Sequence, residues 1–140
     1  MRCVAVKAKK LRYAVELTAA GELREENGVE LQTPEEWSPE HLVLAALVRC
    51  VLQSLRYHAR ATADVRSTSG GAHTLVTRRK TDPVYAMVET TLELTVELEP
   101  GPEFNLSDLL EFAERDCFVG ASLTAEPTYR WTVNGRKIGW

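Results

Sequence analysis

The stretch that begins at Ser38-Pro39-Glu40 constrains the fold of this chain more than any other. Ser is a favoured helix N-cap, Pro suits the first helical position, and an acid in the first turn complements the helix dipole. Helix formers then continue to about Arg60 without Gly or Pro, and every residue from Leu42 to Val48 is apolar. A helix that is apolar all round must be covered on every side, whereas one sheet covers only one face. We therefore expect a homodimer in which the partner chain covers the rest of this helix.

β structure is predicted on both sides of this helix. Residues 86–99 alternate apolar and polar side chains, which is typical of a long strand with one core face and one solvated face. Asn27-Gly28 is a strong hairpin turn. The other strands are expected at residues 3–6, 11–17, 23–24, 29–31, 73–79 and 129–133, and residues 67–71 are interpreted as a turn.

A second helix is predicted between the last two strands. Ser107 is expected to cap it, and Gly120 is expected to stop it shortly after Cys117. Strand blocks separated by two helices favour an α+β fold with antiparallel sheets. With 140 residues and no linker or repeat, we expect a single domain spanning residues 1–140.

Charge and composition exclude several classes of protein. The net charge of −3 argues against nucleic-acid binding, and the basic run Arg78-Arg79-Lys80 is interpreted as a solvated strand end. The longest apolar run is the seven residues 42–48, far below the roughly 20 that a membrane span needs. No signal-peptide core follows Met1, so a cytoplasmic location is expected, with no membrane partner. The His and Cys residues lack metal-ligand spacing, and no metal or other cofactor is expected.

The three cysteines are the candidates for chemistry. Their odd number does not suggest a disulfide scaffold, and Cys3 lies in a predicted strand as a packing residue. Cys50 and Cys117 lie on the two predicted helices, which face one core. They are either buried apolar residues or a pair of thiols in which one attacks a peroxide and the other resolves the sulfenic acid. Because burial disfavours a thiolate, the reactive alternative requires a nearby cation.

Two stretches resemble the OsmC/Ohr family. Residues 38–50, Ser-Pro-Glu-His-Leu-Val-Leu-Ala-Ala-Leu-Val-Arg-Cys, match its (Asn/Ser)-Pro-Glu start and the Cys ten residues after the Glu. Residues 109–117, Leu-Leu-Glu-Phe-Ala-Glu-Arg-Asp-Cys, resemble its second-cysteine helix. The order of elements and the length extend the resemblance over nearly the whole chain.

The resemblance implies an intertwined homodimer and thiol-dependent reduction of organic hydroperoxides, with a dithiol as reductant. It makes Cys50 the peroxidatic thiol, Cys117 the resolving thiol and Glu40 the acid that orients an activating Arg. Arg12 is the choice for that cation, with Lys9 and Arg24 as alternatives. Ten residues of helix separate Glu40 from Cys50 by about 15 Å, so an Arg or the partner chain must bridge them.

Two departures from the family pattern bear on the activity rather than on the fold, and they leave an alternative function open. Thr33-Pro34-Glu35-Glu36-Trp37 replaces the usual Gly-rich loop, and Phe118 follows the second cysteine where many peroxidatic members have Pro. The alternative is a non-catalytic protein that binds a small apolar ligand, with Cys50 as a core residue. The reactivity of Cys50 with a thiol reagent distinguishes the two functions.

Overall fold

The structure, a computed structural model, describes residues 8–140. The chain forms two compact units, residues 1–37 and residues 38–140, and each is described by itself. The strand predicted at residues 3–6, together with Cys3, lies outside the described residues. The expectation of a single domain over residues 1–140 stays a prediction.

The first unit contains a small antiparallel sheet in the order β1-β2-β3. Its strands are β1 (Val15–Leu17), β2 (Leu23–Glu25) and β3 (Glu30–Leu31). The hairpin predicted at Asn27-Gly28 is confirmed, since Gly28 has a φ of +86°, which favours glycine. The strand predicted over 11–17 is shorter, because only three of its residues pair with β2.

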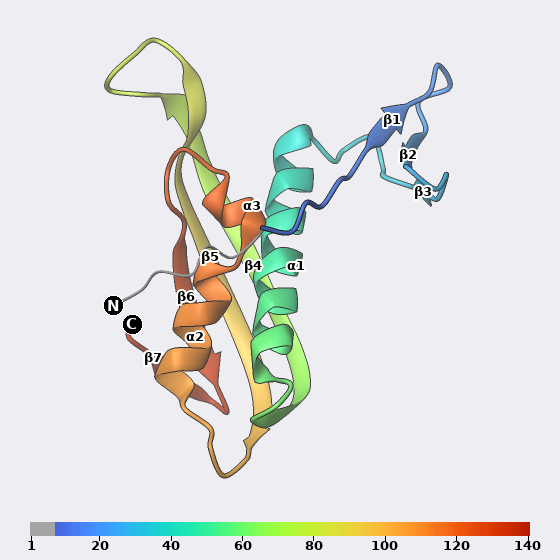
Figure 1. Cartoon of the computed structure of the whole chain (residues 1–140). Coiled ribbons are helices and arrows are strands. Elements are labelled where there is room, and N and C mark those ends of the chain that lie inside the picture. The colour runs from blue at the N-terminus through green and yellow to red at the C-terminus, as the bar shows by residue number, and fades with distance from the viewer. Residues whose placement is uncertain (1–7) are drawn as a thin grey trace. The chain divides into compact units, whose positions relative to one another are not determined.

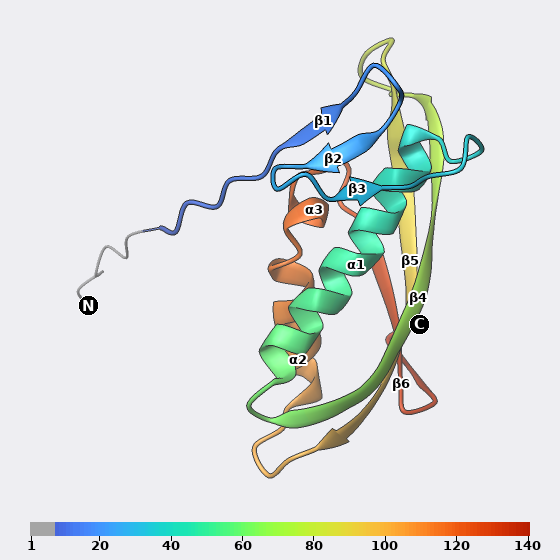
Figure 2. The ribbon, with the colours of Figure 1, turned by 90° about the vertical axis from the view of Figure 1, so that its right-hand side faces the viewer.

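The second unit has two main helices on one face of a four-stranded sheet, as the two views in Figure 1 and Figure 2 show. The sheet order is β4-β5-β6-β7. The elements are α1 (Pro39–Ala59), β4 (Ala63–Arg78), β5 (Tyr85–Pro100), α2 (Leu106–Arg115), α3 (Phe118–Ala121), β6 (Thr128–Val133) and β7 (Arg136–Ile138). The predicted α+β class is confirmed.

Helix α1 begins as predicted. The Ser38 hydroxyl accepts a hydrogen bond from the His41 backbone N–H, and the Ser38 N–H donates to the His41 ring, which completes a capping box. One face of the helix, at a spacing of four residues, is completely buried and consists of Leu47, Val51, Leu55 and Ala59.

The rest of α1 is not covered within this chain. Of the all-apolar residues 42–48, only Leu47 is buried, so the burial expected on every side is not reached by one chain alone. By length and composition α1 is also long and apolar enough to cross a membrane. This is weak evidence for a span, because the core helix of a soluble protein has the same properties and one face of α1 lies in the core.

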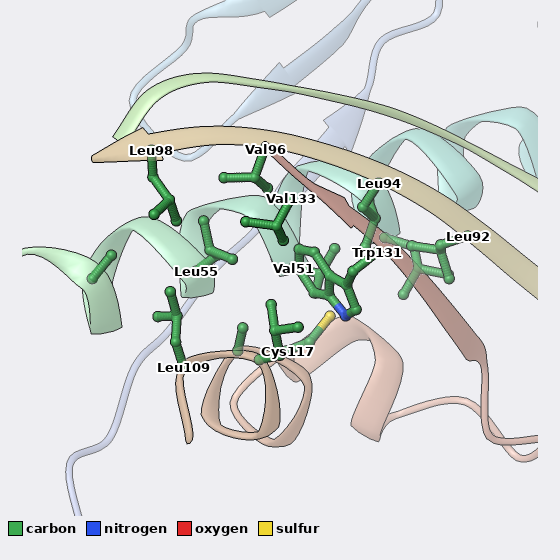
Figure 3. Close-up of a cluster of buried hydrophobic side chains, with 14 residues drawn as sticks. Val51, Leu55, Leu92, Leu94, Val96, Leu98, Leu109, Cys117, Trp131 and Val133 are labelled. Atoms are coloured by element: carbon green, nitrogen blue, oxygen red, sulfur yellow. The ribbon is translucent and has the colours of Figure 1, made fainter. Parts of the chain in front are cut away.

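The hydrophobic core lies between the helices and the sheet (Figure 3). The alternation predicted for the long strand is confirmed, because the side chains of β5 at 92, 94, 96 and 98 are buried and those at 93, 95, 97 and 99 are exposed. Trp131 and Val133 of β6 and Leu109 of α2 pack in the same cluster. The buried face of α1 packs against this cluster on the same face of the sheet as α2.

The turn predicted at residues 67–71 is wrong. These residues lie inside β4, which pairs with β5 from Ala63 to Arg78 and has a bulge between Val65 and Ser67. Gly70 is there because β5 approaches closely: a Cβ at this position would lie 2.8 Å from the Glu93 carbonyl oxygen. The adjacent Gly71 has no atom within 4 Å of such a Cβ.

Three further local predictions are corrected. Asn105, not Ser107, caps α2, because its side chain accepts a hydrogen bond of 3.0 Å from the Asp108 N–H. Gly120 does not stop the helix but is buried inside α3. The sheet is not wholly antiparallel: β5 and β6 are parallel, because the chain returns through α2 and α3. Strand β7, which follows the turn at Asn134-Gly135, was not predicted.

Candidate functional site

The fold of the second unit brings Cys50 and Cys117 together. Cys50 lies on α1, and Cys117 lies between α2 and α3, two helices that both pack against α1. Cys50 lies close enough to Cys117 to raise the pKa of the Cys117 thiol. Cys117 is completely buried and points into the core (Figure 3), whereas Cys50 is partly exposed. The two thiols form a contact across helices rather than two unrelated core positions.

Burial sets the protonation of Cys117. It raises the pKa of this thiol above its ordinary value, and the neighbouring Cys50 acts in the same direction. The Gly120 N–H and the Tyr129 hydroxyl oppose the rise in the pKa, because a donor hydrogen near the sulfur stabilises the thiolate. Cys117 is therefore a thiol held in the neutral form with two donors available to its anion.

Tyr129 and Gly120 form a close contact beside Cys117. A Cβ on Gly120 would lie 2.1 Å from the Tyr129 hydroxyl oxygen, 3.3 Å from the Cys117 sulfur and 3.4 Å from a Leu47 methyl carbon. Only glycine leaves room here for the phenol. The pKa of Tyr129 is raised above its ordinary value, first by burial and then by the Cys117 contact, so the hydroxyl keeps its proton.

A side-chain hydrogen bond connects the helices next to Cys117. His58 Nε2 of α1 lies 2.7 Å from Asp116 Oδ2, at the residue before Cys117. Arg115 also donates two hydrogen bonds to Asp116. Arg115 first, and His58 after it, lower the pKa of Asp116 to about 2. The backbone at Cys117 is thus tied to the last turn of α1.

Sequence reasoning missed His58, Asp116, Gly120 and Tyr129 as neighbours of the cysteines. They come from α1, the end of α2, α3 and β6, so no local spacing connects them. The one signal in the sequence was the alternation over 129–133, which predicts that Tyr129 faces the core with Trp131.

Glu40 lies where it was predicted, in the first turn of α1 and fully exposed. Its own backbone N–H and the Ser38 hydroxyl donate hydrogen bonds that lower the pKa of the carboxyl. In residues 8–140 the ion pairs formed do not include one between Glu40 and an Arg. Its placement in this chain is that of a capping acid, and a role toward Cys50 requires another group to bridge the helix.

The three candidate cations all belong to the first unit. Lys9 and Arg12 precede β1 and are exposed, and Arg24 on β2 forms an ion pair with Glu22. The cysteines belong to the second unit, and the two units are described separately. The choice of Arg12 over Lys9 and Arg24 stays a prediction.

The second unit also has several sizeable cavities, among them one of about 540 Å³ between α2, β6 and β7 that is lined by Tyr129 and Trp131. Two others lie elsewhere in the unit. One, of about 430 Å³, lies at the far end of the β4–β5 hairpin between Leu75, Met87 and the basic residues Arg78 to Lys80. Another, of about 490 Å³, is lined by Tyr129, Gly120 and charged residues of α2. Neither Cys50 nor Cys117 lines any of these three cavities. Within the described residues 8–140, no group of three or more His, Cys, Asp or Glu side chains could hold a metal ion.

The second unit is therefore an α+β domain with two packed helices and a pair of thiols between them. The family model for OsmC-like proteins matches residues 32–132, and the chain belongs to this family. A comparison with functionally curated proteins finds no match.

Solved structures show the same fold. An OsmC-like protein of unknown function from Vibrio cholerae is 13% identical, with a TM-score of 0.69 over 88% of this chain and 100% of the other. An OsmC-like protein from Mycoplasma pneumoniae is 16% identical, with a TM-score of 0.65 over 91% and 99%. An organic hydroperoxide resistance protein from Elizabethkingia anophelis is 18% identical, with a TM-score of 0.60 over 91% and 98%. At these identities the likeness concerns the fold.

Proposed function

We propose that this protein is a thiol-dependent peroxidase that reduces organic hydroperoxides through Cys50 and Cys117. The observation that carries the proposal is the contact between the two thiols, one partly exposed and one completely buried. A partly exposed thiol can meet a substrate, whereas a buried thiol can only react with its neighbour. Membership of a family with hydroperoxide resistance proteins among its structural neighbours supports the same chemistry.

The proposed cycle has three balanced steps. The Cys50 thiol loses its proton, and the thiolate attacks the outer oxygen of the hydroperoxide. The O–O bond breaks, the outer OH stays on the sulfur as the sulfenic acid, and the leaving alkoxide takes up the proton released by the thiol and departs as the alcohol. The Cys117 thiol then attacks the Cys50 sulfur, the S–O bond breaks, and water leaves with the thiol proton. A dithiol finally reduces the Cys50–Cys117 disulfide and becomes a disulfide itself.

The first step requires a cation near Cys50, because a thiolate inside an apolar helix packing is otherwise disfavoured. We propose Arg12 for this role, with Lys9 and Arg24 as alternatives and Glu40 as the acid that orients it. Because ten residues of helix put Glu40 about 15 Å along α1 from Cys50, the two side chains cannot touch, and an Arg or the partner chain must bridge them.

The test uses stopped-flow mixing to measure how fast the wild-type protein consumes an organic hydroperoxide, with a dithiol as reductant. We expect consumption, and we expect Arg12→Ala to slow the first step by about tenfold or more, since the thiolate loses a charged partner. If Arg12→Ala retains activity while Lys9→Ala or Arg24→Ala loses it, the activating cation is Lys9 or Arg24 instead of Arg12. If the wild-type protein consumes no hydroperoxide, the peroxidase hypothesis is wrong, and binding of a small apolar ligand remains as the alternative function.

We further propose that the protein is a cytoplasmic homodimer whose interface includes α1. The support is the exposure of apolar α1 surface, since among residues 42–48 only Leu47 is buried within one chain. We expect sedimentation equilibrium to give twice the 15.7 kDa chain mass at micromolar concentration. Ala46→Glu, at an exposed α1 position, is expected to yield monomer, whereas Gln53→Glu is a control at an exposed position that is already polar. A well-folded wild-type monomer would refute the dimer.

A further inference from the structure

Beside Cys117, the phenol of Tyr129 has no part in the cycle described above. Its hydroxyl oxygen and the Cys117 sulfur both lie against the same side of Gly120, at 2.1 Å and 3.3 Å from where a Cβ would be. The hydroxyl and the sulfur are thus neighbours, and each shifts the pKa of the other: Tyr129 acts to lower that of Cys117, and Cys117 raises that of Tyr129. Tyr129 reaches this place from β6, through the parallel pairing of β6 with β5.

The direction of a hydrogen bond between the two groups follows from their protonation. The pKa of Tyr129 is raised by burial, by the Cys117 contact and by the Glu114 carboxylate of α2, so its O–H remains a donor. The Cys117 thiol in turn faces the Cys50 sulfur. The order of the contacts is therefore Tyr129 O–H, Cys117 sulfur and Cys50 sulfur, across β6, the α2–α3 junction and α1.

We propose that Tyr129 is the hydroxyl donor that stabilises the Cys117 thiolate and so controls the resolving step. This inference rests on the proposed peroxidase function and adds a residue to it. When Cys117 attacks the Cys50 sulfenic acid, its sulfur loses a proton as the S–S bond forms and hydroxide leaves to become water. A donor already in place lowers the free energy of that anion, because hydrogen bonds to charged groups are stronger than those between neutral groups.

The position of Tyr129 also explains how a buried sulfur can exchange its proton. Cys117 is completely buried and does not line the 490 Å³ cavity, whereas Tyr129 and Gly120 both line it. The charged and titratable groups that face the pair are Cys50 from α1 and Glu114 from α2, and Glu126 acts on Glu114. The phenol thus lies between the thiol and a cavity open to water.

The first test does not depend on peroxidase activity. In a Cys3→Ser, Cys50→Ser background, Cys117 is the single thiol, and its ionisation is followed by the ultraviolet absorbance of the thiolate. Adding Tyr129→Phe is expected to raise the titration midpoint by about one pH unit, which corresponds to the loss of one hydrogen bond to the anion. Tyr85→Phe, at an exposed tyrosine of β5, is the matched control and is expected to leave the midpoint unchanged. An unchanged midpoint in Tyr129→Phe overturns the proposal.

The second test separates the two chemical steps with all cysteines present. After one equivalent of organic hydroperoxide, the Cys50 sulfenic acid is trapped with a dione reagent at successive times and quantified by mass spectrometry. Tyr129→Phe is expected to form the sulfenic acid at the wild-type rate and to convert it to the disulfide about tenfold more slowly at neutral pH. The difference is expected to disappear at a pH above both midpoints, which a purely structural defect would not do.

The outcomes of the two tests can be told apart. If wild type forms no sulfenic acid, the proposed peroxidase fails while the titration still decides whether Tyr129 stabilises the thiolate. If wild type reacts and Tyr129→Phe resolves the sulfenic acid at the wild-type rate at every pH, the role of Tyr129 is refuted and the peroxidase stands. The phenyl ring retained in Phe keeps the packing of Tyr129 against the core, and equal thermal melting of the two proteins verifies the fold.

Discussion

Cys50→Ser is expected to abolish hydroperoxide reduction, whereas Cys117→Ser is expected to allow one turnover and then stop at the sulfenic acid. The asymmetry follows from the two environments, because the partly exposed Cys50 does the O–O chemistry and the buried Cys117 only reacts with the product at Cys50. Stopped-flow consumption of an organic hydroperoxide in each variant measures both effects. If Cys117→Ser consumes one equivalent of hydroperoxide per chain and no more, the reaction of this variant stops at the sulfenic acid.

Cys3→Ser is the matched control for these two variants and is expected to retain full activity. Mass spectrometry of the oxidised wild-type protein is expected to find Cys50 joined to Cys117 within one chain, with Cys3 reduced. The existing contact between the two thiols supports this pairing, since a disulfide forms without large backbone movement only between cysteines already close together. Wild-type activity in Cys50→Ser would make Cys50 a core residue and exclude it as the nucleophile.

The second large effect is expected at Gly70 of β4, and the adjacent Gly71 provides its control. Gly70→Ala is expected to lower the free energy of unfolding by about 1–3 kcal/mol, because the new methyl group meets the Glu93 carbonyl oxygen at 2.8 Å and a Leu94 side-chain carbon at 2.9 Å. Backbone oxygen in a paired strand cannot move aside as the end of a side chain can. The overpacked strand must therefore shift or the β4–β5 pairing must open locally.

Gly71→Ala is the control one residue along the same strand. No atom lies within 4 Å of a Cβ at this position, so alanine is expected to be neutral or stabilising by up to about 1 kcal/mol, since it restricts the unfolded chain. Urea denaturation of the two variants measures both values. Equal stability of the two variants would show that β4 and β5 do not approach at Gly70 as closely as this structure has them.

Local patterns in the sequence determined several elements of this protein. The Ser38 cap, the apolar run that follows it and the acid at Glu40 predicted α1 almost to the residue, because capping and helix propensity depend on neighbours within one turn. The period of two over residues 86–99 predicted β5 and its buried face for the same reason. These signals do not depend on what the rest of the chain does.

The resemblance of two short stretches to a family predicted more than any local pattern. The serine, proline and glutamate before Cys50 and the helix before Cys117 suggested the OsmC/Ohr family, and the match over residues 32–132 confirms it. The resemblance alone left the proximity of Cys50 and Cys117 a hypothesis. Periodicity places a side chain on a face of its own helix but does not give the register between two helices.

Tertiary structure alone decided the features that depend on distant residues. Gly70 and Gly71 look like a turn in the sequence, yet β5 pairs along them, and a Gly-Gly pair carries the same local signal in a turn and in a closely approached strand. Strand β6 runs parallel to β5 because two helices intervene.

The surroundings of Cys117 were decided in the same way. Tyr129 follows Cys117 by twelve residues in the chain. Its phenol lies beside Gly120 because of the position at which β6 pairs with β5. The sequence by itself placed Cys50 inside the first helix and Cys117 near the end of the second, and it made these two cysteines the candidates for chemistry. The packing of those elements decided which atoms touch, because side chains far apart in the chain meet only when the core between them is closed.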